Sequence, residues 1–128
     1  MSKGEQKITQ ILQQNKVQFE TEKTFNDLRG GRFRFDFYLP KLKTIIEYDG
    51  EQHFQQIGKF QQDRKELLAY QERDRQKNSY CLAHKIKLYR IPYWEFNNIN
   101  TLKDLFKDNF LVKSRWHNDD VWRKFQSK

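Results

Sequence analysis

The sequence predicts an α/β domain built around a small mixed β-sheet. Two segments, residues 2–15 and 60–83, carry apolar residues at helical spacing, and shorter segments alternate apolar and polar residues as half-buried strands do. Turn residues separate the segments, among them Gly30-Gly31, Pro40 and Gly50. In chain order, the elements give the prediction α-β-β-β-α-β-α.

The first half of the chain predicts one helix and three strands. Ser2 and Glu5 fit a capping box at the start of the helix over residues 2–15. Strands are expected over residues 17–23, 32–39 and 43–49, and the short joint at residues 40–42 makes the last two a hairpin. Alternation along these two strands predicts one face with Phe33, Phe35 and Phe37, the opposite face with Arg34, Asp36 and Tyr38, and a further shared face with Ile45, Glu47 and Asp49.

The second half predicts a long helix, a strand and a last helix. Helical spacing over residues 60–83 puts one stripe toward the sheet, made of Leu67, Tyr70, Asp74, Lys77 and Cys81. A strand over residues 85–91 ends at Pro92, and residues 101–112 are expected to be helical. The tail at residues 113–128 is basic and aromatic and has no predicted place, so residues 1–112 are expected to form the working domain.

Charge and composition narrow the function classes. The chain has 25 Lys and Arg against 17 Asp and Glu, a net charge of +8, which favours a polyanionic partner, most often nucleic acid and less often an anionic membrane. An aromatic content of 16 % argues against a disordered basic tail, and the lone Cys81 excludes a disulfide scaffold and suits a reducing cytoplasm. No apolar run is long enough to span a bilayer or to act as a signal peptide, so we expect a cytoplasmic protein without a membrane partner.

Three carboxylates on the predicted hairpin are the strongest chemical signal. Asp36, Glu47 and Asp49 sit on strands that a short turn brings side by side, so they can converge. Carboxylates that close repel one another unless a divalent cation lies between them, and Mg²⁺ prefers oxygen ligands of this kind. The alternative is a solvated polar strand face with turn residues at its end.

Other polar residues extend the candidate site. Gln52 and His53 follow Gly50 at the same strand end, and a histidine beside a metal-bound water can transfer protons, although a lone histidine after a turn is often ordinary surface chemistry. Asp74 lies with Lys77 on the inward stripe of the long helix, which makes it either half of a structural ion pair or a site component. Glu5 has the capping box as its structural alternative.

The order of these residues resembles the PD-(D/E)XK nuclease superfamily. The similarity runs through Glu5, RFRFDF, IIEYDGEQHF, ERDRQKN and KLYRIPY, covers about residues 2–105, and is most specific in IIEYDGEQHF. The chain looks most similar to the branch of very short patch repair endonucleases and phage-type homing endonucleases. That resemblance implies a restriction-endonuclease-like core and Mg²⁺-dependent cleavage of DNA, as a nick or a double-strand cut, with Mn²⁺ able to substitute, in a bacterial or phage-infected cell.

The resemblance also implies residue roles. Asp36 matches the metal-binding Asp and Glu47 the acidic residue of the second half-motif, while Asp49 occupies the position where a Lys is expected. In the repair-like branch that Lys is also missing and a histidine takes over proton transfer, so His53 matches this histidine. Glu5 then matches the acid of the N-terminal helix, Asp74 the acid that orients His53, and Lys77 is a candidate for a migrated lysine.

A duplex needs basic contacts, and the sequence offers them near aromatic residues. The candidates for phosphate binding are Arg32, Arg34, Lys41, Lys43, Lys85, Lys87 and Arg90, with a solvated basic face as the alternative. The chain alone has no separate reader module, which favours low specificity, a homodimer or a DNA-targeting partner. Two other function classes stay open: a DNA-binding accessory protein with a weakened nuclease fold, and an RNA-binding or protein-interaction module.

Overall fold

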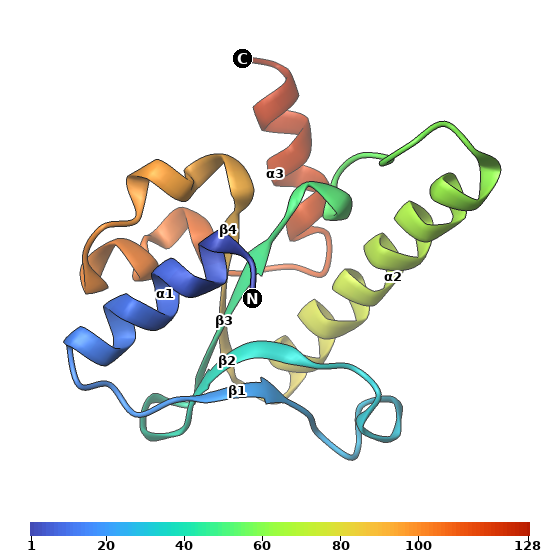
Figure 1. Ribbon diagram of the computed structural model, residues 1–128. Coiled ribbons are helices and arrows are strands. Elements are labelled where there is room, and N and C mark those ends of the chain that lie inside the picture. Colours follow the sequence, from blue (N-terminus) through green and yellow to red (C-terminus); the bar gives the residue numbers. More distant parts are fainter.

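Four strands form one mixed sheet in the order β1-β2-β3-β4 in the computed structural model, which describes all 128 residues (Figure 1). The strands are β1 (Glu20–Lys23), β2 (Phe35–Leu39), β3 (Thr44–Asp49) and β4 (Lys87–Pro92). The first two pairs are antiparallel and β3 pairs with β4 in parallel. Helices cover both faces of the sheet, so the predicted α/β class is confirmed.

The predicted hairpin is present between β2 and β3. A single 3-10 turn, Pro40–Leu42, reverses the chain, and Lys43 follows in the left-handed region at φ 48°. The pairing register sets Phe37 opposite Ile46 and Leu39 opposite Thr44. Strand β3 is central and runs parallel to β4. The carboxyl ends of the two strands, and the loop that follows β3, therefore lie at the same end of the sheet.

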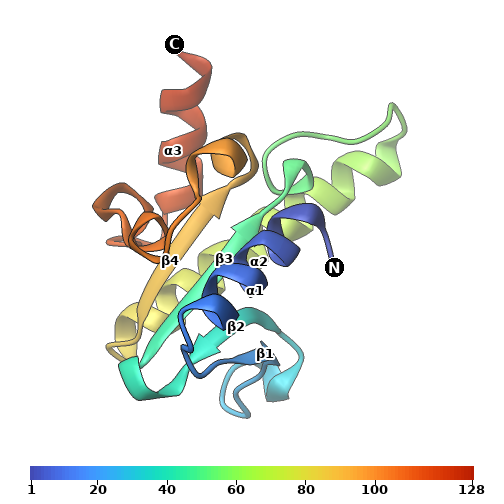
Figure 2. The ribbon, with the colours of Figure 1, turned by 60° about the vertical axis from the view of Figure 1, so that its left-hand side comes forward.

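Helix α1 (Lys3–Gln14) covers one face of the sheet (Figure 2). It begins with the predicted capping box, in which the Glu5 amide donates to Ser2 Oγ at 3.2 Å and the Ser2 amide donates to Glu5 Oε1 at 3.3 Å. Its buried residues Ile8, Ile11 and Leu12 join a core cluster with Phe37 and other strand residues. At Gly4 the helix comes so close to the sheet that an added Cβ would meet the Tyr48 ring at 2.2 Å.

Helix α2 (Gln61–Ala83) crosses the other face. Its inward stripe agrees with the prediction: Asp74, Lys77 and Cys81 are buried, while Leu67 and Tyr70 are partly buried. The second core cluster, which includes Phe35, Ile45, Tyr80 and Leu88, lies between this helix and the sheet. None of the helices combines the length and apolar character that a membrane-spanning segment needs.

The expected single face of three phenylalanines is wrong. Phe37 belongs to the α1-side cluster, whereas Phe33 and Phe35 pack in the α2-side cluster. The regular ladder between β2 and β3 stops at Phe37, because beyond it carboxylate side chains replace backbone carbonyls as acceptors. The regular alternation of faces along β2 is therefore lost between Phe35 and Phe37, next to Asp36 of the candidate site.

The predicted helix over residues 101–112 is also wrong. The chain forms two short 3-10 segments there, Leu102–Phe106 and Asp108–Phe110, separated by Lys107 in an extended conformation. Leu105 and Phe110 still reach the core, and Leu111 then adds an isolated antiparallel bridge to Tyr89 of β4. The last helix is instead α3 (His117–Gln126), within the tail that the sequence left unplaced.

Candidate active site

A cleft of ≈ 490 Å³ opens between α1, the β2–β3 hairpin and α2. Its lining includes nearly all the candidates, namely Glu5, Asp36, Glu47, Gln52, His53, Asp74 and Lys77, together with Arg32, Arg34, Tyr48, Tyr70 and Arg73. Residues that are up to 72 positions apart in the chain thus share one solvent-accessible space. Asp49 is absent from this lining.

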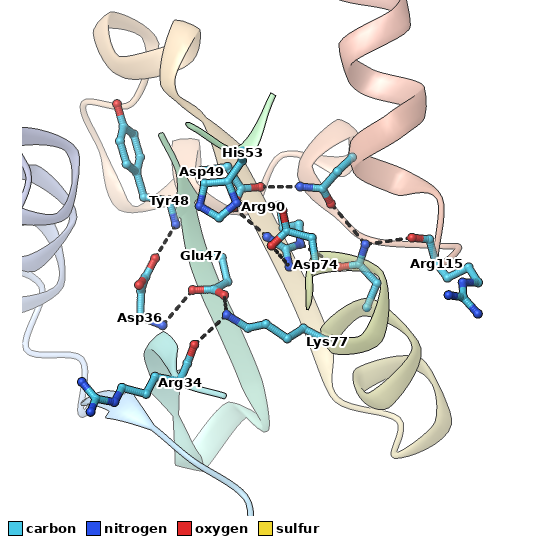
Figure 3. Close-up of polar contacts among 12 residues, drawn as sticks. Arg34, Asp36, Glu47, Tyr48, Asp49, His53, Asp74, Lys77, Arg90 and Arg115 are labelled. Atoms are coloured by element: carbon cyan, nitrogen blue, oxygen red, sulfur yellow. Dashed lines mark hydrogen bonds and ion pairs between the residues drawn. The ribbon is translucent and has the colours of Figure 1, made fainter. Parts of the chain in front are cut away.

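Asp36 and Glu47 face each other across the end of the β2–β3 ladder (Figure 3). The Asp36 amide donates to Glu47 Oε2 at 2.8 Å, and the Tyr48 amide donates to Asp36 Oδ2 at 2.8 Å. Each carboxylate therefore takes the acceptor place that a backbone carbonyl would have in a regular ladder. These two hydrogen bonds from backbone amides fix both carboxylate side chains against the strands.

Lys77 reaches this pair from α2. Its ammonium group forms an ion pair with Glu47 Oε1, donates to the Arg34 carbonyl at 2.6 Å and lies 4.7 Å from the centre of the Phe35 ring. The sequence left open an ion pair between Asp74 and Lys77, but Lys77 pairs with Glu47 instead. A lysine ammonium therefore does lie beside the acidic pair, although it comes from a helix and not from β3.

Burial and neighbouring charges shift the pKa values of the Asp36 and Glu47 carboxyl groups in opposite directions. Burial raises the pKa of Asp36 to about 10, and the nearby Glu47 carboxylate adds to the increase. Burial alone would also raise the pKa of Glu47, but Lys77 and Arg90 outweigh it and lower that pKa to about 2. The two pKa values are therefore pushed apart, that of Asp36 upward and that of Glu47 downward.

Asp49 lies in a separate, buried network, so the expected convergence of three carboxylates is wrong for this residue. It is 1 % exposed; its Oδ1 accepts from Arg90 Nη1 at 2.6 Å and its Oδ2 accepts from Asn118 Nδ2 at 2.9 Å. Burial raises the pKa of Asp49 although Arg90 opposes the change. Both Asp49 oxygens are therefore engaged within the protein and do not line the cleft.

Arg90 is consequently not a DNA contact, contrary to the prediction. Its side chain is 1 % exposed, its Nε donates to Asn78 Oδ1 at 2.7 Å, and its Nη2 lies 3.4 Å from Asp74 Oδ1. Two buried carboxylates, Asp49 and Asp74, need a positive charge beside them, and Arg90 on β4 supplies it. The alternating pattern of a strand does not distinguish this buried arginine from a solvated one.

His53 connects the buried network with the cleft. Its Nδ1 lies 2.7 Å from Asp74 Oδ2 and 3.7 Å from Asp49 Oδ1, and its side chain is 14 % exposed. Burial opposes a charged ring, but Asp49 and Asp74 outweigh this effect and raise the pKa of His53 above its ordinary value. The predicted role of Asp74 in orienting His53 agrees with this geometry, and Asp74 also neutralises Arg90.

Asn118 is a site residue that the sequence reasoning missed. It is 6 % exposed at the start of α3, where its Nδ2 donates to Asp49 and its Oδ1 accepts from Asn78 at 3.1 Å. Arg75 of α2 holds the same helix through two hydrogen bonds to Asp119, at 2.8 and 3.2 Å. An asparagine in a charged, unplaced tail carries no signal of its own, so only the tertiary structure reveals it.

The predicted phosphate contacts divide into two groups. Arg32 and Arg34 line the cleft, and Arg73 of α2, which the sequence did not single out, joins them. Lys43, Lys85 and Lys87 are exposed but lie at the other end of the sheet, where Thr44 pairs with Lys87. Only the arginine group can contact a nucleic acid whose backbone lies in the cleft.

Two groups of side chains could offer ligands to a magnesium ion. Asp36 and Glu47 offer carboxylate oxygens at the cleft, and the proton held by Asp36 marks a pair that a cation would stabilise. The ligand atoms of Asp49, His53 and Asp74 also lie within 4.8 Å of one another. Asp49 and Asp74 already pair with Arg90, as Glu47 pairs with Lys77, so a metal ion at either place would compete with an existing positive charge. Asp36 and Glu47 line the cleft, whereas Asp49 does not.

Comparisons with known proteins give two viral relatives. The chain is 36 % identical over 77 residues to uncharacterized protein 094L of Frog virus 3 (isolate Goorha), which covers 59 % of this chain and 45 % of that protein. It is 33 % identical over 79 residues to uncharacterized protein 307L of Invertebrate iridescent virus 6, covering 60 % and 36 %. The match thus spans less than half of either relative. No family model and no solved structure matches the chain.

Proposed function

We propose that this chain is a Mg²⁺-dependent DNA endonuclease similar to the PD-(D/E)XK nucleases. The observation that carries the proposal is the cleft of ≈ 490 Å³, which brings together an acidic pair, a histidine held by an aspartate, a lysine and three arginines. Phosphodiester hydrolysis needs charge neutralisation, a positioned water and a proton path to the leaving oxygen. The cleft contains residues suited to each of these tasks.

Asp36 and Glu47 would hold the Mg²⁺ ion. When bound, Mg²⁺, or Mn²⁺ in its place, neutralises phosphate oxygens and makes a bound water more acidic. Glu47 is already ionised and Asp36 would release its proton on binding, so metal affinity should increase with pH. Lys77 holds Glu47 in place and is the substitute for the lysine that Asp49 replaces on the strand.

His53 is the proposed proton-transfer residue. The bond between Nδ1 and Asp74 fixes the orientation of the ring and leaves Nε2 for exchange with a substrate or a water. Because its pKa is raised, His53 is more protonated near neutral pH than an ordinary histidine, which suits donation of a proton to the leaving oxygen. Arg32, Arg34 and Arg73 would bind the flanking phosphates.

A DNA-binding accessory protein without activity is the second candidate. Two observations favour it: the Glu47–Lys77 ion pair is balanced without any metal, and no lysine follows Glu47 on β3. Against it stands the placement of two carboxyl groups inside the cleft, because carboxyl groups make no favourable contact with phosphate and give a pure binding protein no advantage.

Supercoiled plasmid separates the two candidates. The full chain is incubated with plasmid in Mg²⁺, in EDTA, and in EDTA followed by excess Mg²⁺, and nicked and linear products are measured on a gel. The nuclease proposal expects conversion in Mg²⁺, none in EDTA and recovery on adding the metal back. Equal cleavage in all three conditions, or binding without cleavage in any of them, would contradict it.

A further inference from the structure

A second hollow, of ≈ 220 Å³, lies on the other side of His53. It is lined by His53 and Phe54 after β3, by Gln71 of α2, and by five α3 residues, Asn118, Asp119, Trp122, Arg123 and Gln126. His53 is the only residue that this hollow shares with the cleft. Whatever binds there is therefore a direct neighbour of the group that reaches the proposed scissile phosphate.

The walls of this hollow contain stacked aromatic rings and side-chain amides that make no hydrogen bond within the chain. The ring of Trp122 is partly exposed and lies between aromatic neighbours: it stacks with Phe54 at 24° and 5.3 Å, and with Phe125 at 9° and 5.6 Å. Phe54 is only 4 % exposed and supports Trp122 from below, so the aromatic surface open to a planar ring is the exposed part of Trp122. Asn118 and Asp119 are engaged by Asp49 and Arg75, but the Gln71 and Gln126 amides have no hydrogen-bond partner within the chain. Arg123 lies at the rim and pairs with Asp120 at 3.2 Å.

We propose that this hollow binds one unstacked nucleobase of the DNA strand whose backbone lies in the cleft. A volume of ≈ 220 Å³ is below the roughly 300–1,000 Å³ of pockets for drug-sized ligands and suits a single ring system. Aromatic surfaces stack on any base, and amides can both donate to and accept from its polar edge. The inference rests on the proposed function, because it takes the strand from the cleft past His53.

The test compares strands that differ by one base. Each probe is a fluorescent strand of nine abasic (tetrahydrofuran) units. One probe has no base, and four others each have one of the four DNA bases at the central unit. Binding of each probe to the full chain is measured in EDTA. The phosphates are the same, so any difference in affinity reports the base alone. For at least one base we expect about 5- to 150-fold tighter binding, the range for stacking of a single base on an aromatic side chain.

Three variants locate the base. Gln71→Met and Gln126→Met keep the side-chain length but remove the amide, so each should reduce the gain from the base and leave affinity for the base-free strand unchanged. Gln62→Met, on the exposed side of α2 and outside the hollow, is the matched control and should retain the full gain. Thermal melts confirm that each variant is folded.

Three results would overturn the inference. They are equal binding of all strands, a base-dependent gain that neither glutamine variant reduces, and binding of a free deoxynucleoside monophosphate as tight as that of the strand. Because EDTA prevents metal-dependent cleavage, these outcomes are independent of the plasmid experiment. Cleavage without a base effect would contradict only the base site, and a base effect without cleavage would contradict only the nuclease.

Discussion

His53 owes its place to a balance of buried charges. The carboxyl groups of Asp49 and Asp74 both contact Arg90, and His53 Nδ1 lies 2.7 Å from Asp74 and 3.7 Å from Asp49. A buried network of this kind is costly unless every member has a partner. The same balance that keeps the network stable also raises the pKa of the histidine at the edge of the cleft.

Replacing His53 should separate turnover from binding. His53→Gln is expected to reduce the nicking rate by roughly 10²- to 10⁴-fold, the usual effect of removing a general acid or base. DNA affinity should barely change, because the arginines of the cleft remain. His84→Gln, at the exposed histidine beyond the far end of α2, is the control and should keep wild-type activity. A large loss of affinity with normal turnover would make His53 a phosphate contact instead.

Asp74 combines the two roles that the sequence left as alternatives, since it contacts both His53 and Arg90. Asp74→Asn keeps the shape of the side chain but removes a buried charge, and breaking such a pair costs roughly 3–5 kcal/mol. We therefore expect a lower melting temperature together with a lower rate whose pH dependence is shifted. A stable variant with a normal pH–rate profile would exclude both roles.

At the scale of elements, α3 belongs to the site although it lies outside the predicted domain. Asn118→Leu removes the donor to Asp49 and the acceptor for Asn78, and each buried polar group left without a partner costs about 1–3 kcal/mol. The melting temperature should fall and the nicking rate with it. Asn97→Leu, at an exposed position, serves as the control. If Asn118→Leu matched the wild type in both measurements, α3 would be only a surface addition.

The docking of α3 should also depend on pH through His117. Burial and the nearby Arg90 lower the pKa of His117 to about 4, below its ordinary value of 6.5. Between these values the unfolded chain takes up a proton that the folded chain refuses, so the free energy of unfolding falls as pH drops from about 6.5 to about 4. The slope from this group is at most about 1.4 kcal/mol per pH unit. Urea unfolding of His117→Gln should show a smaller slope in this window, and an unchanged slope would contradict the assignment.

Regular elements were predictable where periodicity was strong. The α2 stripe from Leu67 to Cys81 and the presence of the β2–β3 hairpin follow from local patterns. The pattern failed for the phenylalanines of β2, which divide between the two faces of the sheet. Residues 101–112 were not predictable, because their apolar spacing suits both a helix and two 3-10 turns. After the second turn, Leu111 forms a bridge to Tyr89 of β4, a long-range contact that the local spacing does not contain.

The candidate site, like the fold, was predictable only where local sequence patterns determine the position of a residue. Asp36, Glu47 and His53 stand next to turns whose positions the sequence shows, so their presence at one sheet edge could be predicted. The direction of Asp49 toward Arg90, and the arrival of Asn118 from the tail, depend on how α2 and α3 pack, which no local pattern contains.

At the scale of the whole molecule, the basic residues predicted to contact phosphate lie in two places. Arginines surround the cleft, while Lys43, Lys85 and Lys87 lie at the opposite end of the sheet. One cleft per chain can cut one strand at a time, so a monomer should nick DNA, and a double-strand cut needs a second copy or a second event. The distal lysines are then free to contact a partner or a second stretch of DNA.

The most direct test of the account is the plasmid nicking rate of Asp36→Asn against the wild type across a range of Mg²⁺ concentrations. The amide keeps the acceptor for the Tyr48 amide but cannot bind the cation as a carboxylate does. We predict Mg²⁺-dependent nicking by the wild type and by the exposed control Asp108→Asn, and none by Asp36→Asn, with unchanged folding and DNA affinity. Nicking by Asp36→Asn at the wild-type rate and with the same Mg²⁺ dependence would contradict the assignment of this cleft as the active site.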